Sequence, residues 1–212
     1  STFTMSGGTI NLVQASTGAT PIDMQVRSNA FTVTDDVVNV GTAATATNFN
    51  FRLRANLPNI VIDDTTNPKT ATATAQINLR GTTTINPGGT LVINGQVCLV
   101  IGPSFVNNGT LTGTAASTRF YFLGGSGATT YSGSGQVTAP LTAFEVDNVD
   151  GVTIDPAVNQ IVATRFNNFS GGVTGAGKLT FGNGGATNAV IQLGVTGATE
   201  PVFGFDVAPT FN

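Results

Sequence analysis

The sequence predicts an all-β protein, and within that class a parallel β-helix, on three observations. Short stretches that alternate apolar and polar residues follow one another along nearly the whole chain. Turns rich in Gly and Asn separate these stretches at close intervals. Only 9% of the 212 residues are charged, and the chain has neither His nor Trp. A β-sandwich is the alternative, because alternation alone does not distinguish the two folds.

Each expected strand shows a period of two, which places successive side chains on opposite faces. In Arg119–Phe122, for example, Phe120 and Phe122 are expected to face the core and Tyr121 the surface. The expected strands are Thr9–Val13, Phe31–Thr34, Phe49–Arg54, Ile60–Ile62, Ile77–Leu79, Thr90–Ile93, Arg119–Phe122, Phe144–Val146, Gly151–Ile154, Lys178–Phe181 and Val190–Leu193. The turns between them include Asn86–Gly89, Asn94–Gly95, Asn107–Gly109, Gly124–Gly127 and Asn183–Gly185. No segment has a helical period.

Composition excludes several classes of protein. A net charge of −3 argues against a nucleic-acid partner, which requires a basic surface. The longest apolar run, Val97–Ile101, has the length of a strand and is far too short to span a membrane. Cys98 lies within this run and is the chain's one cysteine, so we expect a buried thiol and no internal disulfide.

A parallel β-helix accounts for the low charge. Each turn of roughly 20 residues would stack on the one before at a strand spacing of about 4.8 Å, so that like residues lie above like. Charged side chains stacked in this way would repel one another, whereas Asn and Thr can form hydrogen bonds along the stack. About ten turns of that size would fit into the chain.

Internal repeats favour the solenoid over the sandwich. The segment Ala55–Asp63 aligns without gaps on Asp147–Asp155, with identical residues at Asn56/Asn148, Ile62/Ile154 and Asp63/Asp155. This is one strand-turn-strand unit used twice.

A second recurrence links the two ends of the chain in collinear order. Met5–Gly8 is similar to Phe169–Gly172, Thr17–Ile22 to Thr196–Val202, and Met24–Val26 with Phe31 to Phe205–Val207 with Phe211. We therefore expect residues 1–212 to form a single β-solenoid segment, cut from a longer array whose repeat restarts near residues 165–170.

These units resemble a known group of proteins. Phe3–Ile10, Leu57–Asp63, Asn107–Gly113 and Phe169–Gly172 look like the repeats of very large, secreted, β-helical surface proteins of Bacteroidetes-type bacteria, which are similar to filamentous adhesins. The resemblance implies a parallel β-solenoid, an extracellular location at the cell surface and a structural or adhesive role. It implies no catalytic residues.

The sequence gives little indication of a catalytic or a metal-binding site. Asp35–Asp36 and Asp63–Asp64 are acidic doublets, but neighbouring residues of a strand point to opposite faces, so neither doublet forms a catalytic pair. No cofactor is expected. If a metal binds, calcium fits best, with Asp147, Asp150 and Asp155 as oxygen ligands.

A ligand surface has two sets of candidate residues. Tyr121 and Tyr131 are the aromatic residues that a glycan could stack on. Thr70, Thr72 and Thr74 form a Thr-x-Thr-x-Thr array, of the kind that presents hydroxyl groups to a glycan or to ice, although the spacing between such arrays in this chain is irregular.

The sequence thus predicts a non-enzymatic, extracellular structural or adhesive protein: a stalk or filament subunit that associates with itself, or with further repeats of the same chain, through open β-edges. The alternatives are a surface module that binds glycans or ice, and a β-helical enzyme that degrades polysaccharides with Asp35 or Asp63.

Overall fold

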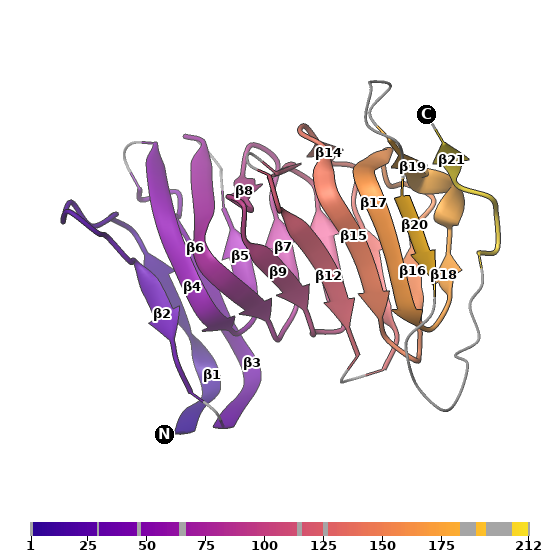
Figure 1. Ribbon diagram of the computed structural model, residues 1–212. Helices are drawn as coiled ribbons and strands as arrows, with labels where there is room; N and C mark the ends of the chain where they lie inside the picture. Colours follow the sequence, from indigo (N-terminus) through magenta and orange to yellow (C-terminus); the bar gives the residue numbers. More distant parts are fainter. Residues whose placement is uncertain are drawn as a thin grey trace.

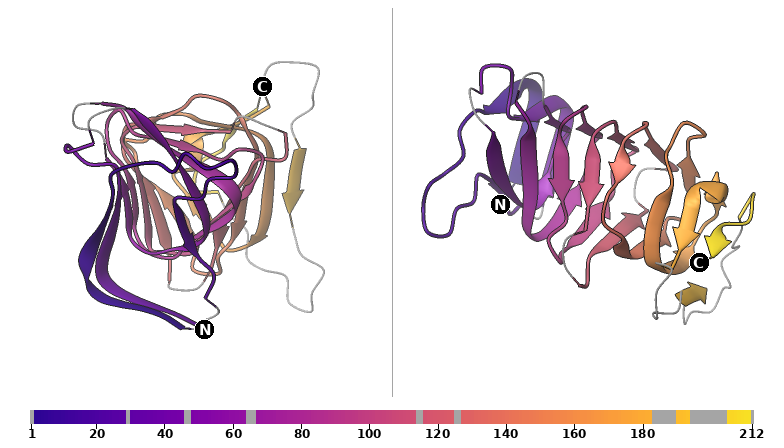
Figure 2. Two further views of the ribbon diagram at one scale, coloured as in Figure 1. Left: turned by 90° about the vertical axis from the view of Figure 1, so that its left-hand side faces the viewer. Right: turned by 90° about the horizontal axis from the view of Figure 1, so that it is seen from above.

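The computed structural model describes residues 2–28, 30–45, 48–63, 67–113, 116–124, 127–182, 190–193 and 205–211. Its strands form a parallel β-solenoid, as the sequence predicts, and the sandwich alternative is wrong. The solenoid has about six turns rather than the roughly ten expected. Every strand ladder is parallel, and the coils stack into an elongated body with the two termini at opposite ends (Figure 1). The view along the body shows the coils superimposed around one interior (Figure 2).

Each full turn passes through three walls. Wall A is an eight-stranded sheet. In spatial order it contains β1 (Thr2–Leu12), β3 (Ala30–Val40), β5 (Ile60–Ile62), β7 (Thr83–Ile85), β10 (Ser104–Asn107), β13 (Thr129–Ser132), β16 (Val152–Ile154) and β18 (Val173–Thr174).

The second sheet has thirteen strands and bends into two walls, because its longest strands continue around a corner. Wall B contains the first parts of β4 (Phe49–Leu57), β6 (Lys69–Leu79) and β17 (Ile161–Ser170), together with β8 (Thr90–Val92), β11 (Thr110–Thr112), β14 (Gln136–Val137), β19 (Leu179–Phe181) and β21 (Thr210–Phe211). Wall C contains the second parts of β4, β6 and β17, together with β2 (Met24–Val26), β9 (Val97–Val100), β12 (Arg119–Leu123), β15 (Leu141–Asp147) and β20 (Val190–Leu193).

The turns vary in length, whereas the sequence analysis expected turns of roughly 20 residues each. Aligned positions on wall A are separated by 21 residues between Val152 and Val173 but by 28 residues between Thr2 and Ala30. The corners absorb these extra residues, since the strands stay in register. The structure also contains a short 3-10 helix, η1 (Ala176–Lys178), where no helix was expected.

Inward-facing residues form columns that run along the axis. On wall C one such column aligns Ile77, Cys98, Phe120, Phe144 and Phe166, all fully buried. Successive rings in this column lie 6.2 and 6.3 Å apart between centroids. The prediction that Phe120, Phe122 and Cys98 face the core is confirmed. The core is thus a continuous stack of apolar side chains.

The two segments of the first internal repeat each leave wall C, turn a corner and enter wall A as β5 and β16. Their identical residues do not superimpose, however. Along the wall A ladder, Ile154 aligns with Ile60 rather than with Ile62, and Asn56 lies within β4 whereas Asn148 follows β15. The two segments therefore cross the same pair of walls, but with an offset of two residues.

In the second recurrence only a glycine conformation is shared, because Gly7 lies within β1 and Gly171 lies at the corner between β17 and β18. Gly7 and Gly171 both have a positive φ, and a Cβ at Gly171 would lie 1.8 Å from the carbonyl oxygen of Asn148, so only glycine fits there. In contrast, Met24–Val26 pairs with β4 on wall C, whereas Phe205 pairs with Val173 on wall A. These last segments are not equivalent in space, and residues 196–200 lie outside the described residues.

Candidate functional site

The N-terminal end of the solenoid is partly closed on wall B. There the carboxylate of Asp23 accepts backbone hydrogen bonds from Arg52 (2.7 Å) and Ser16 (2.6 Å), and the Asp23 amide donates to the Arg52 carbonyl (2.9 Å). Walls A and C end in β1 and β2, each paired on one side only within the described part of the chain. The outer edges of these two strands are open.

The C-terminal end leaves core columns uncovered. The column that contains Phe166 continues to Ile191 on β20, and a second inward column continues to Leu193. On wall B, Phe211 continues the column after Phe181. Ile191, Leu193 and Phe211 are 40%, 52% and 52% exposed, whereas Phe166 and Phe181 are fully buried. Among the described residues, no coil lies above these three side chains, which occupy core positions.

Threonines of successive coils align on the outside of wall B. Thr70, Thr90 and Thr110 are direct ladder partners, and Thr72 aligns with Val92 and Thr112. Each step in these two rows is 20 residues, so the threonines stack one coil apart. Thr74 lies where β6 bends toward wall C, exposed, with its hydroxyl directed at the Leu53 carbonyl (3.4 Å).

Tyr121 lies on the outside of wall C within a polar network. Its hydroxyl donates to Asp147 Oδ2 (3.0 Å), and Ser170 donates to Asp147 Oδ1 (2.7 Å). Burial and the contact with the Asp147 carboxylate raise the pKa of Tyr121. The guanidinium of Arg119 lies 5.7 Å from the Tyr121 ring centroid. The Tyr121 ring is therefore partly covered, and its hydroxyl already has a partner.

Arg119 also anchors a neighbouring carboxylate. Its Nε and Nη2 atoms lie 2.7 and 2.6 Å from Glu145 Oε2, and Asn167 donates to Glu145 Oε1 at 2.5 Å. Glu145 is 2% exposed although it belongs to the outer row of wall C. Glu145 and Asp147 are two carboxylates on the same outer face of β15. The sequence Phe144-Glu145-Val146-Asp147 has an acid at every second residue of a strand, a signal that could have identified this pair.

Tyr131 does not lie on the surface. It is 1% exposed and stacks on Phe105 with ring centroids 5.4 Å apart. Its hydroxyl accepts a hydrogen bond from Asn107 at 3.2 Å. Tyr131 is therefore a core residue and offers no platform for a glycan. In the segment Thr-Thr-Tyr-Ser both alternating rows contain a polar residue, so alternation could not show which row faces inward.

The acidic residues singled out in the sequence are dispersed. Asp35 is exposed and Asp36 is fully buried, so this doublet faces two sides as expected, and Asp64 lies outside the described residues. Asp155 accepts a bond from the Ala157 amide (2.8 Å), which closes a turn. Within the described ranges, no three His, Cys, Asp or Glu side chains are grouped so that they could hold a metal ion. The same part of the chain contains no helix of the length and apolarity that a membrane span requires.

No family model, curated protein or solved structure matches this chain. The geometry of the molecule alone carries the functional inferences below.

Proposed function

We propose that this chain is a structural segment of an extracellular surface protein, a β-solenoid stalk or filament subunit that associates through its open β-edges. The observation that carries the proposal is the uncovered core at the C-terminal end, where Ile191, Leu193 and Phe211 continue buried columns yet remain about half exposed. A further coil on this end would bury all three. That coil can come from a second copy or from further repeats of the same chain.

Strand direction supports such a continuation. All ladders are parallel, so a copy translated along the axis presents its first strands in the orientation that the last strands require. A head-to-tail contact of this kind does not close on itself and produces an open fibre. Of the large apolar side chains that are exposed among the described residues, only Val149 lies away from the end regions. The others are Val13, Ile22, Val190, Ile191, Leu193, Val207 and Phe211.

The walls suit a fibre because few of their rows carry charge. The outer row of wall A that begins at Ser104 continues through Thr130, Thr153 and Thr174. Stacked hydroxyl groups do not repel one another as stacked charges would. Walls of this kind can be lengthened by further coils at no electrostatic cost.

The test is electron microscopy and sedimentation velocity of the purified chain, with Ile191→Lys as the disrupting variant. The ammonium group would lie in the contact, where its desolvation costs several kcal/mol. We expect fibres and a concentration-dependent sedimentation coefficient for the parent protein, and monomers for Ile191→Lys.

The matched control is Val149→Lys, which introduces the same charge at an apolar residue that is 79% exposed and lies in a corner. This variant should form fibres like the parent. Monomers at every concentration for the parent protein, or equal loss of assembly in both variants, would contradict assembly through the ends.

A further inference from the structure

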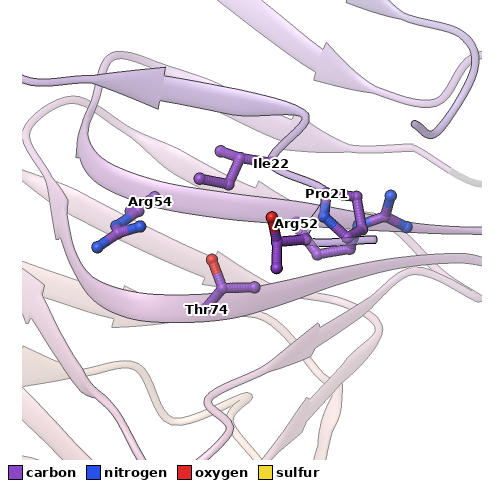
Figure 3. A pocket seen from close by; sticks show the side chains of 6 residues that line it. Pro21, Ile22, Arg52, Arg54 and Thr74 are labelled. Atoms are coloured by element: carbon purple, nitrogen blue, oxygen red, sulfur yellow. The ribbon is translucent and has the colours of Figure 1, made fainter. Parts of the chain in front are cut away.

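A hollow of about 370 Å³ opens beside the N-terminal coils. It is lined by the segment Thr20–Ile22, which precedes β2, and by Arg52, Arg54 and Thr74 from β4 and β6. In Figure 3, Arg54 lies on one side and Pro21 and Arg52 on the other, with Ile22 and Thr74 between them. Its volume lies within the range of about 300–1,000 Å³ that is typical of small-molecule sites.

The two arginines of the hollow differ in their partners. Arg52 forms an ion pair with Asp23 (Nε to Oδ2, 2.9 Å) and donates to the carbonyl oxygens of Ser16 and Asn50. Arg54 is partly buried, and its guanidinium has no hydrogen bond or ion pair with any residue that the structure describes. Its ladder partner on β2 is the uncharged Gln25. One guanidinium is therefore committed to the fold and the other is free.

The unpaired guanidinium of Arg54 favours a ligand that carries a single negative charge. Arginine presents donors in a planar fork that matches a carboxylate through two parallel hydrogen bonds. A single free positive charge balances a single negative charge better than it balances a phosphate dianion. The carboxylate of Asp23 cannot serve as the partner because it is already held by Arg52 and Ser16. A carboxylate from outside the chain can therefore serve as the partner of Arg54.

The remaining lining residues suit a sugar ring. Ile22 and Pro21 form an apolar wall on which the C–H groups of a ring can lie, and Ile22 is 37% exposed. The hydroxyl groups of Thr20 and Thr74 lie at the same hollow and can exchange hydrogen bonds with ring hydroxyls. A ring that carries one carboxylate, several hydroxyls and one apolar face is a uronic acid.

We propose that this hollow binds one uronic-acid residue of an acidic polysaccharide, with Arg54 pairing the sugar carboxylate and Ile22 packing against the ring. The site lies beside the N-terminal end, since Thr20–Ile22 precede the edge strand β2 and Arg54 is the ladder partner of Gln25 on that strand. It would give the solenoid an affinity for acidic glycans at one defined place along its length.

The experiment is calorimetric titration with trigalacturonate at low salt, with maltotriose as the neutral probe. We expect saturable binding of trigalacturonate that weakens as salt is added, and far weaker binding of maltotriose. Arg54→Gln should lower the affinity roughly 10- to 100-fold, the range expected for losing a charge-assisted hydrogen-bonded pair. Arg54→Lys, which keeps the charge but not the fork, should fall between the parent and Arg54→Gln.

The matched control is Arg165→Gln, which removes an exposed arginine of wall C distant in sequence and not part of the hollow. It should change the affinity less than twofold. Circular dichroism of each variant establishes that the fold is retained. The proposal is overturned by the absence of saturable binding, by equal binding of both sugars, by unchanged affinity in Arg54→Gln, or by equally tight binding of a short acidic peptide.

Discussion

The buried carboxyl group of Asp36 is expected to lower the free energy of unfolding of this protein. It lies on β3 in the inward row that continues with Val38 and Val40, and all three side chains are 0% exposed. Neither carboxylate oxygen has a hydrogen-bond partner among the residues that the structure describes. Its neighbour on β1 is Gly8, which has no side chain to offer. The substitution Asp36→Val replaces this carboxyl group by an apolar group of similar shape that suits a strand.

The expected gain follows from the cost of the unpartnered group. A buried polar group without a hydrogen bond costs about 1–3 kcal/mol, and a carboxyl group with two such oxygens should lie at or above the upper part of that range. We expect Asp36→Val to raise the free energy of unfolding by about 2–4 kcal/mol. For a protein of this size each kcal/mol shifts Tm by about 2–4 °C, so the rise should be roughly 4–16 °C.

Urea unfolding followed by circular dichroism measures the effect, with the m-value checking that the unfolded state is unchanged. Asp35→Asn is the control, because it removes the same charge from the adjacent, exposed position and Asn tolerates the positive φ of 57° found there. It should change stability by less than about 0.5 kcal/mol. If Asp36→Val is less stable than Asp35→Asn, the carboxyl group has a stabilising partner in the folded protein and the reasoning is refuted.

Three further outcomes are expected. Phe144→Ala, in the fully buried column, should lower the free energy of unfolding in urea by about 3–5 kcal/mol. Burial raises the pKa of Tyr131 from 10.0 to about 12 and also raises the pKa of Tyr121. Because stability conferred by a raised pKa is lost as the pH rises through it, the free energy of unfolding should fall between pH 10 and 12. Absorbance titration should show no tyrosinate before unfolding begins. Burial likewise raises the pKa of Cys98, so a thiol reagent at neutral pH should label it only in denaturant.

Alternation was sufficient to predict which side chains enter the core wherever one row is clearly apolar. Phe51 and Leu53 face inward and Arg52 outward on β4, as the period of two requires. Low charge and the recurrence of Ala55–Asp63 in Asp147–Asp155 were sufficient to favour a solenoid over a sandwich, although the structure offsets the two segments by two residues.

The sequence could not reveal contacts across coils. The 20-residue steps from Thr70 to Thr90 and Thr110 match the expected turn length. The 26-residue step from Phe105 to Tyr131 depends instead on how many residues the corners hold, and no local rule sets that number. The hollow at Arg54 was missed for the same reason, since Ile22 lies 32 positions away along the chain. Arg54 can be identified as unpaired only when the structure shows that the neighbouring carboxylate of Asp23 is already held by Arg52 and Ser16.

Because its corners vary in length, the solenoid can change its width without changing its length. The step from Phe105 to Tyr131 uses 26 residues and the step from Val152 to Val173 uses 21, yet each advances the wall by one strand, about 4.8 Å. Residues added at a corner therefore widen the rod without lengthening it, whereas a duplicated turn lengthens it by one fixed increment. In a solenoid of this kind, the length can thus change through duplicated turns and the width through residues inserted at corners, each independently of the other.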